Sequence, residues 1–392
     1  MKFLGYQRPD GSVGIRNHVL VIPSLLHGFI SSQICSMVQG TKTISIPSGN
    51  FEGHTNRDRE KADRTLIGLG LNPNVASVIV DNEYRSLLPI SEEIAKSGKR
   101  VVTLDSKSDG GTFGSIGKGV QIAREMVVAA SKMRRQEFDM SHLTLAVKCG
   151  GSDATSGIAG NPVVGNVFDR IIEAGGTAMF GENTEIVGAE HVLAKRAVND
   201  AVAKRIKKAA DDIDAAVQST GEDLRTINPT QGNKDGGLST IEEKSLGAIH
   251  KSGTKPIQDV IEYGERPQGK GLYWCDNNPG MNIFTGYAAS GAQILFQSTG
   301  TTSFPSNYDL LLTSPGIVSP LLFTTANPRT VELAPTAIDF YSGTVLEGAD
   351  TIESAGETLL RLVLDVASGT MTNVETFSYQ NPTSFYLKDP VF

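Results

Sequence analysis

The sequence predicts a two-domain α/β protein, in which a Rossmann-like domain with a parallel sheet precedes a second, larger α/β domain. Three observations support this fold class. The chain has 392 residues, a length typical of two or three domains. Short β-branched runs alternate with amphipathic stretches, which is the pattern of a parallel sheet covered by helices on both faces. Glycine contributes 42 residues without forming a repeat, which indicates many tight loops between the elements.

Four strand-like runs and four helix-like runs alternate over roughly the first third of the chain. Each strand-like run is short and β-branched, and each helix-like run is amphipathic. Ligands bind at the carboxyl ends of the strands in such sheets, so the loops after these strands are candidate binding loops. The predicted strands are 18–24, 42–48, 75–81 and 100–106, and the predicted helices are 30–39, 57–70, 89–98 and 116–135.

A second series of elements follows the polar stretch 132–142, which predicts a linker and divides the chain into domains 1–140 and 141–392. Strands are predicted at 143–149 and 177–181, and helices at 162–175, at about 189–218 and at 239–253. Ser239 is the predicted N-cap of the last helix, with Glu242 in the capping-box position. Residues 221–237 are expected to form a polar loop. The remainder is expected to alternate strands with loops rich in Gly, Pro, Ser and Thr.

The composition argues against binding to nucleic acids or membranes. The formal net charge is −7, with acidic and basic residues mixed along the chain, whereas nucleic-acid binding requires a basic face. The N-terminus has no signal-peptide core, and the longest apolar run near it is too short to cross a bilayer. Cys35, Cys149 and Cys275 have neither metal-finger nor redox spacing. We therefore expect a soluble cytoplasmic protein.

The stretch AVKCGGSDATSGIAGNP, residues 146–162, is a glycine-rich turn between a predicted strand and a predicted helix. Such a turn exposes backbone N–H groups that can hold an anion. It matches neither the GxGxxG fingerprint nor the phosphate loop, so no nucleotide cofactor is expected. A small carboxylate substrate fits better, with Lys148 as its charge partner and Gly150 and Gly151 allowing close approach. The alternative is an inert turn, with Lys148 in solvent and Cys149 as buried filler.

The stretch FGENTEIVGAEHVL, residues 180–193, gathers acidic residues and a histidine at the end of a predicted strand and the start of a helix. Glu182, Glu185, Glu190 and His191 have the oxygen and imidazole donors that can hold a divalent metal. The alternative is that the helix dipole favours glutamate at its N-terminus. That explains Glu190, but it does not explain Glu182 or Glu185.

Two further loops offer polar side chains to a substrate. In NPTQGNKDGG, residues 228–237, Asn233 and Lys234 could read the hydroxyl groups of a polyol acid, although a flexible surface loop has the same composition. In GNFEGHTNRDRE, residues 49–60, His54 follows a predicted strand and could act as a base or ligand. A lone loop histidine is more often neither.

Placed in order, these segments resemble the large, catalytic part of the altronate and galactarate dehydratase family. The resemblance runs from about residue 4 to about residue 350. It implies a lyase that removes water from a sugar acid such as altronate or galactarate to give a 2-keto-3-deoxy acid. A sub-branch eliminates sulfite from sulfolactate instead, giving pyruvate. The motifs are GYQRPDGSVGIRNHVLVIPS, LNPNVASVIV, KCGGSDATSGIAGNPVVG, ENTEIVGAEHVL, NPTQGNKDGGLSTIEEKSLGA, GLYWCDNNPG and DFYSGTVLEG.

The resemblance also implies a metal, partners and roles for the residues singled out above. It implies a divalent metal, Fe²⁺ or else Mn²⁺, a separate small subunit of the SAF (antifreeze-like) type, and a homo-oligomer. The implied catalytic residues are Lys148, Asp153, Glu185 and His191, and the implied metal ligands are Glu182, Glu185 and His191. The implied substrate-binding residues are Gly150, Gly151, Ser152, Asn233, Lys234 and His54.

The chain departs from the sugar-acid dehydratases in its N-terminal half and near its end. SGNFEGHTN and VDNEYRS stand where the family often carries cysteine-containing elements, and DFYSG replaces DINCG. The leading hypothesis is a metal-assisted dehydratase of a sugar acid. The second is the large subunit of a sulfolactate sulfo-lyase. The third is a binding or regulatory relative that has kept the fold and lost the chemistry.

Overall fold

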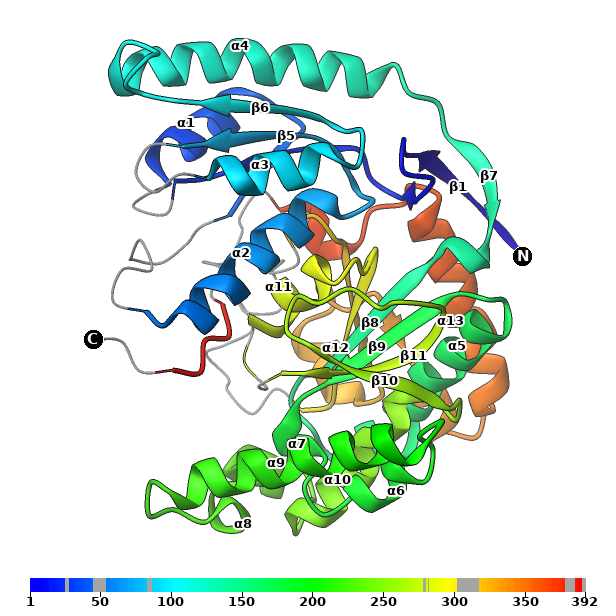
Figure 1. Ribbon diagram of the computed structural model, residues 1–392. Helices are drawn as coiled ribbons and strands as arrows, with labels where there is room; N and C mark the ends of the chain where they lie inside the picture. Colours follow the sequence, from blue (N-terminus) through cyan, green and yellow to red (C-terminus); the bar gives the residue numbers. More distant parts are fainter. Residues whose placement is uncertain are drawn as a thin grey trace.

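The computed structural model describes residues 1–24, 28–44, 54–82, 87–277, 280, 282–301, 317–377 and 385–389. Two parallel sheets with helices on their faces are joined by a small antiparallel sheet of order β2-β1-β7 (Figure 1). In this small sheet, β1 (Lys2–Gln7) pairs with both β2 (Val13–Gly14) and β7 (Gln136–Asp139). The α/β fold class predicted from the sequence is confirmed. The polar stretch expected to be a linker contains β7, which ties it to the start of the chain.

The N-terminal sheet has four parallel strands in the order β4-β3-β5-β6. Alternate residues of its strands point to opposite faces, so each face carries its own apolar cluster. One face packs against α1 and α4, and the other against α2 and α3 (Figure 1). The elements are β3 (His18–Ile22), α1 (Phe29–Met37), β4 (Thr41–Thr43), α2 (Asn56–Leu71), β5 (Val75–Asp81), α3 (Leu88–Ala95), β6 (Arg100–Leu104) and α4 (Gly111–Ser131).

The C-terminal sheet has seven strands, all parallel, in the order β10-β11-β9-β8-β12-β13-β14. The chain leaves β8 in one direction towards β9 and later returns beside β8 to form β12, so the strand order reverses between β8 and β12. Such a reversal opens a crevice at the carboxyl ends of the two strands. The strands are β8 (Thr144–Cys149), β9 (Thr177–Gly181), β10 (Ile257–Glu262), β11 (Gly271–Asp276), β12 (Ile294–Thr299), β13 (Leu321–Thr325) and β14 (Phe340–Tyr341).

Helices cover both faces of the larger sheet. One face packs against α5 (Asn161–Glu173), α7 (Asp200–Gln218), α10 (Ile241–Ile249) and α13 (Ile352–Ala367). The opposite face packs against α11 (Asn282–Ala289) and the residues that follow α12 (Pro328–Leu333). Helix α11 also packs against α2, so the two domains share apolar contacts (Figure 1). None of the described helices is long and apolar enough to span a membrane.

The long helix predicted at 189–218 is wrong, because the chain forms two helices there. Helix α6 (Glu190–Ala194) ends before a short extended stretch, and α7 begins at Asp200. The backbone N–H of Val198 donates to the carbonyl of Ile257 at 3.1 Å, which draws this stretch to the edge of the sheet. The Asn199 side chain then caps α7 by accepting from the N–H of Val202. Sheet pairing therefore overrides local helix propensity.

Three other predictions for the C-terminal half were also wrong. The loop expected at 221–237 contains two short helices, α8 (Leu224–Ile227) and α9 (Gln231–Asp235). Thr240, and not Ser239, caps α10, because its side chain accepts from the N–H of Glu243. The last third is not only strands and loops, since α13 runs over four turns behind a capping box formed by Thr351 and Ser354.

Candidate active site

The glycine-rich loop after β8 lies at the point where the strand order reverses. Its backbone is bound to the end of β12, because the N–H of Gly150 donates to the carbonyl of Ser298 at 2.7 Å. The N–H of Gly151 donates to Oγ1 of Thr299 at 3.1 Å. A Cβ on Gly150 would lie 2.2 Å from that same Oγ1, so only glycine allows this close approach. The loop therefore closes the end of the crevice between β8 and β12.

Asp153 and Asn233 fix the shape of this loop. The buried Asp153 carboxylate accepts from the N–H of Ser156 at 2.8 Å and from Nδ2 of Asn327 at 2.8 Å. The Asn233 side chain, on α9, donates through Nδ2 to the carbonyl of Ser152 at 2.9 Å. Both carboxylate oxygens of Asp153 are thus engaged in holding the loop, and Asn233 connects the loop to α9.

Glu182 lies directly after β9, on a strained backbone and next to the glycine-rich loop. Its φ of 81° is in the left-handed region, which a residue other than glycine adopts only when its surroundings enforce it. Oε2 of Glu182 accepts from the N–H of Cys149 at 2.8 Å and from Nζ of Lys251 at 2.6 Å. Oε1 has no hydrogen-bond partner among the described residues and lies 3.6 Å from Nζ of Lys148. One oxygen is therefore anchored, and the other is left facing an ammonium group.

Lys251 links two buried carboxylates. It follows α10 and is 1% exposed, and its Nζ donates to Glu182 and, at 2.9 Å, to Oε2 of Glu185. Oε1 of Glu185 lies 3.6 Å from Nζ of Lys244, which in turn donates to Oδ1 of Asn233 at 3.1 Å. We call Lys148, Glu182, Glu185, Lys244 and Lys251 the lysine–glutamate cluster. Three ammonium groups face two carboxylates in it, so the cluster carries one surplus positive charge.

The two glutamates have pKa values displaced in opposite directions. Burial raises the pKa of Glu182, and the Glu185 carboxylate raises it further against the opposing effect of Lys251 and Lys148. Burial also acts to raise the pKa of Glu185, but Lys251 and Lys244 outweigh it and lower that pKa to about 2. Neighbouring carboxyl groups that titrate apart can divide their roles, with one moving protons and the other remaining charged.

Cys149 is buried beside the cluster as a protonated thiol. Burial, followed by the Glu185 carboxylate, raises its pKa to about 12. Its Sγ lies 2.7 Å from Oγ of Ser152 within the glycine-rich loop. The thiolate form that a nucleophile requires is therefore disfavoured.

A small cavity lies beside the cluster and has Lys244 in its wall. Its volume is about 220 Å³, and Ser152 and Asp153 contribute the edge of the glycine-rich loop. Ile158 and Leu238 supply apolar surface. The cavity is small enough to suit a low-molecular-weight acid, and it brings that acid to the buried ammonium group of Lys244.

Comparison with known proteins identifies the family. Residues 140–388 match the C-terminal domain of D-galactarate/altronate dehydratase, and residues 5–131 match the second domain of D-galactarate dehydratase/altronate hydrolase. The chain belongs to the D-galactarate/altronate dehydratase family. The family membership predicted from the motifs is confirmed.

Three named relatives match nearly all of this family member. The (2R)-sulfolactate sulfo-lyase subunit beta of Chromohalobacter salexigens is 36% identical over 383 residues, which cover 96% of this chain and 95% of that subunit. The altronate dehydratase of Bacillus subtilis is 30% identical over 402 residues, covering 98% of this chain and 77% of that enzyme. The galactarate dehydratase (L-threo-forming) of Escherichia coli is 30% identical over 404 residues, covering 96% of this chain and 74% of that enzyme. These relatives are lyases, as the motifs predict for this chain.

The structure brings together only part of the predicted site of this dehydratase-family chain. Lys148, Glu182, Glu185 and Asn233 meet at the cluster, beside the loop of Gly150, Gly151, Ser152 and Asp153. His191 lies exposed on α6, and Lys234 lies exposed on α9. His54 is half-buried directly before α2, next to residues 45–53, which lie outside the described part of the chain. The roles assigned to these residues stay predictions.

The metal implied by the family does not fit the described residues. In the described part of the chain, no three His, Cys, Asp or Glu side chains gather closely enough to hold a metal ion. Glu182 and Glu185 accept from Lys251, and His191 is exposed on α6, so the predicted three-ligand set is not assembled. A divalent cation between these carboxylates would meet the ammonium groups of the cluster. We therefore assign no step of the reaction to a metal.

Sequence reasoning missed Lys244 and Lys251 as members of the site. Lys244 stands inside the motif IEEKSLGA, where a charged residue also suits an exposed helix face. Lys251 follows the same helix, where a basic residue is expected from the helix dipole alone. No local pattern separates them from surface lysines. Only the fold shows that they are buried against glutamates 59 to 69 residues earlier in the chain.

Proposed function

We propose that this chain is a lyase that removes the C2 proton of a small 2-hydroxy acid and expels a group from C3, with (2R)-sulfolactate as its substrate. The observation that carries the proposal is the buried lysine–glutamate cluster at the point where the strand order reverses. A proton next to a carboxylate is very weakly acidic, and its removal requires fixed positive charge near the enediolate that forms. The surplus charge of the cluster supplies it.

The geometry suggests a division of labour within the cluster. Oε1 of Glu182 lacks a hydrogen-bond donor among the described residues, so it is the atom available to accept the C2 proton. Lys148, 3.6 Å from that oxygen, is placed to pair with the substrate carboxylate. Lys251 holds the other oxygen of Glu182 and fixes the direction of the side chain. Lys244 and Asn233 are placed to bind the far end of the acid, where the cavity begins.

The proposed reaction is a β-elimination. The C2 proton passes to Glu182, and the electron pair of the C2–H bond is first held in the enediolate. This pair then forms the C2–C3 double bond as the C3–S bond breaks, and the electron pair of the C3–S bond leaves with sulfite. The resulting enol takes up a proton at C3, loses the proton of its C2 hydroxyl group and becomes pyruvate. Loss of water from C3 of a sugar acid follows the same course and gives a 2-keto-3-deoxy acid.

Sulfolactate is favoured over a sugar acid by the comparison with named relatives. The sulfo-lyase subunit has the higher identity and is matched over 95% of its length, against 77% and 74% for the two dehydratases. Dehydration of a sugar acid is the second candidate, because the chain matches the dehydratase family models over both domains. The proposal includes a small subunit of the SAF type, since the sulfo-lyase relative is named as a subunit. It also includes assembly into a homo-oligomer in the cytoplasm.

A substrate screen tests the proposal. The chain is co-expressed with a small subunit, purified anaerobically, supplied with Fe²⁺ or Mn²⁺, and offered sulfolactate, altronate and galactarate. Sulfite and pyruvate in equal amounts are the expected products. Formation of a 2-keto-3-deoxy acid without sulfite would show a sugar-acid dehydratase in place of a sulfolactate lyase. No turnover of any acid would overturn the lyase proposal in favour of a binding or regulatory relative.

The variant Glu182→Gln tests the assigned base. It keeps the shape of the side chain but removes the proton acceptor, so kcat should fall at least about 100-fold. Glu190→Gln is the matched control, because Glu190 lies in the first turn of α6 and accepts only from the N–H of Gly188 among the described contacts. Equal activity of the two variants would remove Glu182 from the mechanism.

A further inference from the structure

A large cavity lies at the opposite end of the C-terminal sheet from the candidate active site. Its volume is about 510 Å³, and it is lined by the residues at which β8 and β9 begin, Thr144 and Thr177. Lys148 is four residues further along β8, about 13 Å away at the rise of a strand. The two sites therefore occupy opposite ends of the same strands, and the mechanism proposed above does not use this cavity.

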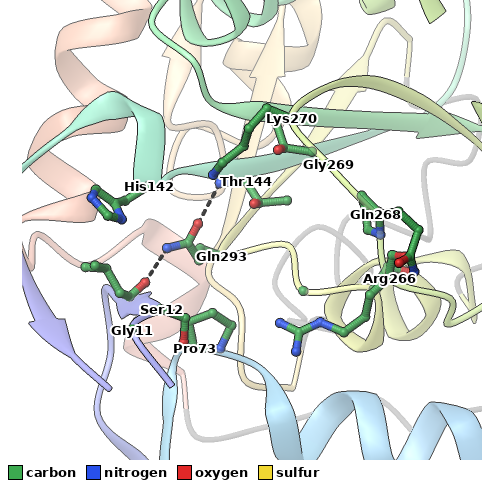
Figure 2. A pocket seen from close by; sticks show the side chains of 15 residues that line it. Gly11, Ser12, Pro73, His142, Thr144, Arg266, Gln268, Gly269, Lys270 and Gln293 are labelled. Carbon is green, nitrogen blue, oxygen red and sulfur yellow. Dashed lines mark hydrogen bonds between the residues drawn. The ribbon is translucent and has the colours of Figure 1, made fainter. Parts of the chain in front are cut away.

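Both domains contribute to the wall of this cavity. Gly11, Ser12 and Pro73 come from the N-terminal side, and the segment 266–270 comes from the loop before β11 (Figure 2). Gln293 joins the two sides, because its side chain donates to the carbonyl of Val13 and accepts from the N–H of Thr144. A molecule in this cavity would touch both domains.

The charge of the lining is positive. Arg266 and Lys270 line the cavity as cations, and no aspartate or glutamate is among its described lining residues. Figure 2 shows the Arg266 side chain reaching into the open space from the loop before β11. The charge of Asp10 acts on Arg266, but the Asp10 carboxylate already accepts from Ser12.

The Arg266 side chain is half-buried, and its guanidinium is not paired within the described part of the chain. Among the described residues, its side chain forms no hydrogen bond and no ion pair. The nearby Arg8, in contrast, donates to the carbonyls of Pro73 and Arg16 and to the side chain of Asn17. A Cβ on Gly291 would lie 3.1 Å from Nη2 of Arg266, so a glycine leaves room for the guanidinium. The donors of Arg266 are therefore available to a ligand in the cavity.

We propose that this cavity binds a small organic or inorganic oxyanion whose carboxylate or phosphate group pairs with the guanidinium of Arg266. A guanidinium matches both groups because its parallel N–H donors can engage two oxygens at once. Lys270 adds a second cation at the edge, with its Nζ donating to the carbonyl of Ser141 at 2.6 Å. The volume leaves room for more than the oxyanion itself, so we expect a carboxylate-bearing metabolite to bind more tightly than free phosphate.

Calorimetric titration of the full chain with citrate and with inorganic phosphate, at constant ionic strength, tests the proposal. Wild-type protein should bind one equivalent of citrate more tightly than phosphate, and Arg266→Gln should weaken binding about tenfold or more. Arg124→Gln removes the same charge from the exposed face of α4 and should bind as the wild type does. If phosphate binds more tightly than citrate, the cavity is still an oxyanion site, and its ligand carries a phosphate group.

Two results would overturn the proposal. One is that neither anion binds to the wild-type protein at a concentration of about 10 mM, which would occupy even a weak metabolite site. The other is equal binding by Arg266→Gln and Arg124→Gln. A crystal of the wild-type protein grown with citrate provides a test that does not depend on the folding of a variant. The anion must lie within hydrogen-bond distance of the Arg266 guanidinium, and a position elsewhere would refute the assignment.

Discussion

Replacing Lys251 by methionine tests the charge balance of the cluster. Methionine has nearly the same length but no charge, so Lys251→Met leaves Glu182 and Glu185 buried without the ammonium group that lies 2.6 and 2.9 Å from their oxygens. Removing one partner of a buried charge pair costs about 3–5 kcal/mol, because the remaining charge is left without compensation. We expect Lys251→Met to lower the free energy of unfolding at pH 7 by that amount.

The pH dependence of this loss has a defined sign. In the wild type, Lys251 and Lys244 hold the pKa of Glu185 at about 2, so its stabilising contribution is present above pH 4.5 and is lost as the pH falls from there. In the variant, burial and mutual repulsion raise the pKa values of both carboxyl groups. The free-energy cost of burying these two unpaired carboxylates is fully present at pH 7 and disappears as they bind protons. The difference in free energy of unfolding between wild type and variant should therefore narrow as the pH is lowered from 7 to 5.

Urea unfolding followed by circular dichroism at pH 7 and pH 5 provides the measurement. Lys255→Met is the matched control, because Lys255 pairs with Glu173, whose side chain is 60% exposed. Removing such a surface pair should cost no more than about 1 kcal/mol at either pH. The reasoning is refuted if Lys251→Met costs no more than Lys255→Met, or if its deficit grows as the pH falls.

Two further predictions concern the N-terminal sheet and the glycine-rich loop. Burial, followed by the charge of Lys42, lowers the pKa of His18 to about 3, so its neutral form stabilises the fold above pH 6.5 and that contribution falls by about 2 kcal/mol at pH 5. Urea unfolding should show that the wild type loses this free energy of unfolding between pH 6.5 and pH 5 and that His18→Gln does not. The same pH dependence of the free energy of unfolding in both proteins would contradict the prediction. Gly150→Ala places a Cβ 2.2 Å from Oγ1 of Thr299 and should lower kcat at least about tenfold. Gly117→Ala, on α4 and far from the candidate site in the fold, places a Cβ with no neighbour within 4 Å and should leave kcat unchanged. Equal kcat values for the Gly150 and Gly117 variants would contradict the steric argument.

The fold could be predicted wherever one local pattern decided an element. The strand predicted at 75–81 is β5 over the same residues, because a short, largely buried run with four β-branched residues has no competing helical pattern. The prediction failed where a distant partner decided the structure. Residues 195–199 read as helix, yet the backbone of Val198 bonds to Ile257 across sixty residues of sequence. No local propensity contains that information.

The candidate site divides in the same way. Lys148, Glu182 and Glu185 could be predicted because Lys148 lies near the end of β8 and the two glutamates follow β9. The carboxyl ends of parallel strands meet at one edge of the sheet. His191 was grouped with the glutamates because it is close to them in sequence, but α6 leaves it exposed. Lys251 was missed for the opposite reason, since only the path of the chain around α10 brings it to Glu182. Proximity in sequence is a poor guide to a site built from several strand ends.

The cost of this cluster argues that it serves chemistry more than stability. Well-packed apolar side chains in place of a buried ion-pair network are often equally stable or more so. The backbone of Glu182 adds strain, since a φ of 81° costs about 1–3 kcal/mol for a residue with a side chain. What this arrangement provides is a carboxylate with one oxygen anchored by Cys149 and Lys251 and the other left facing Lys148. A β-elimination needs such a fixed base beside a positive charge, whereas a binding protein could hold an anion with the lysines alone.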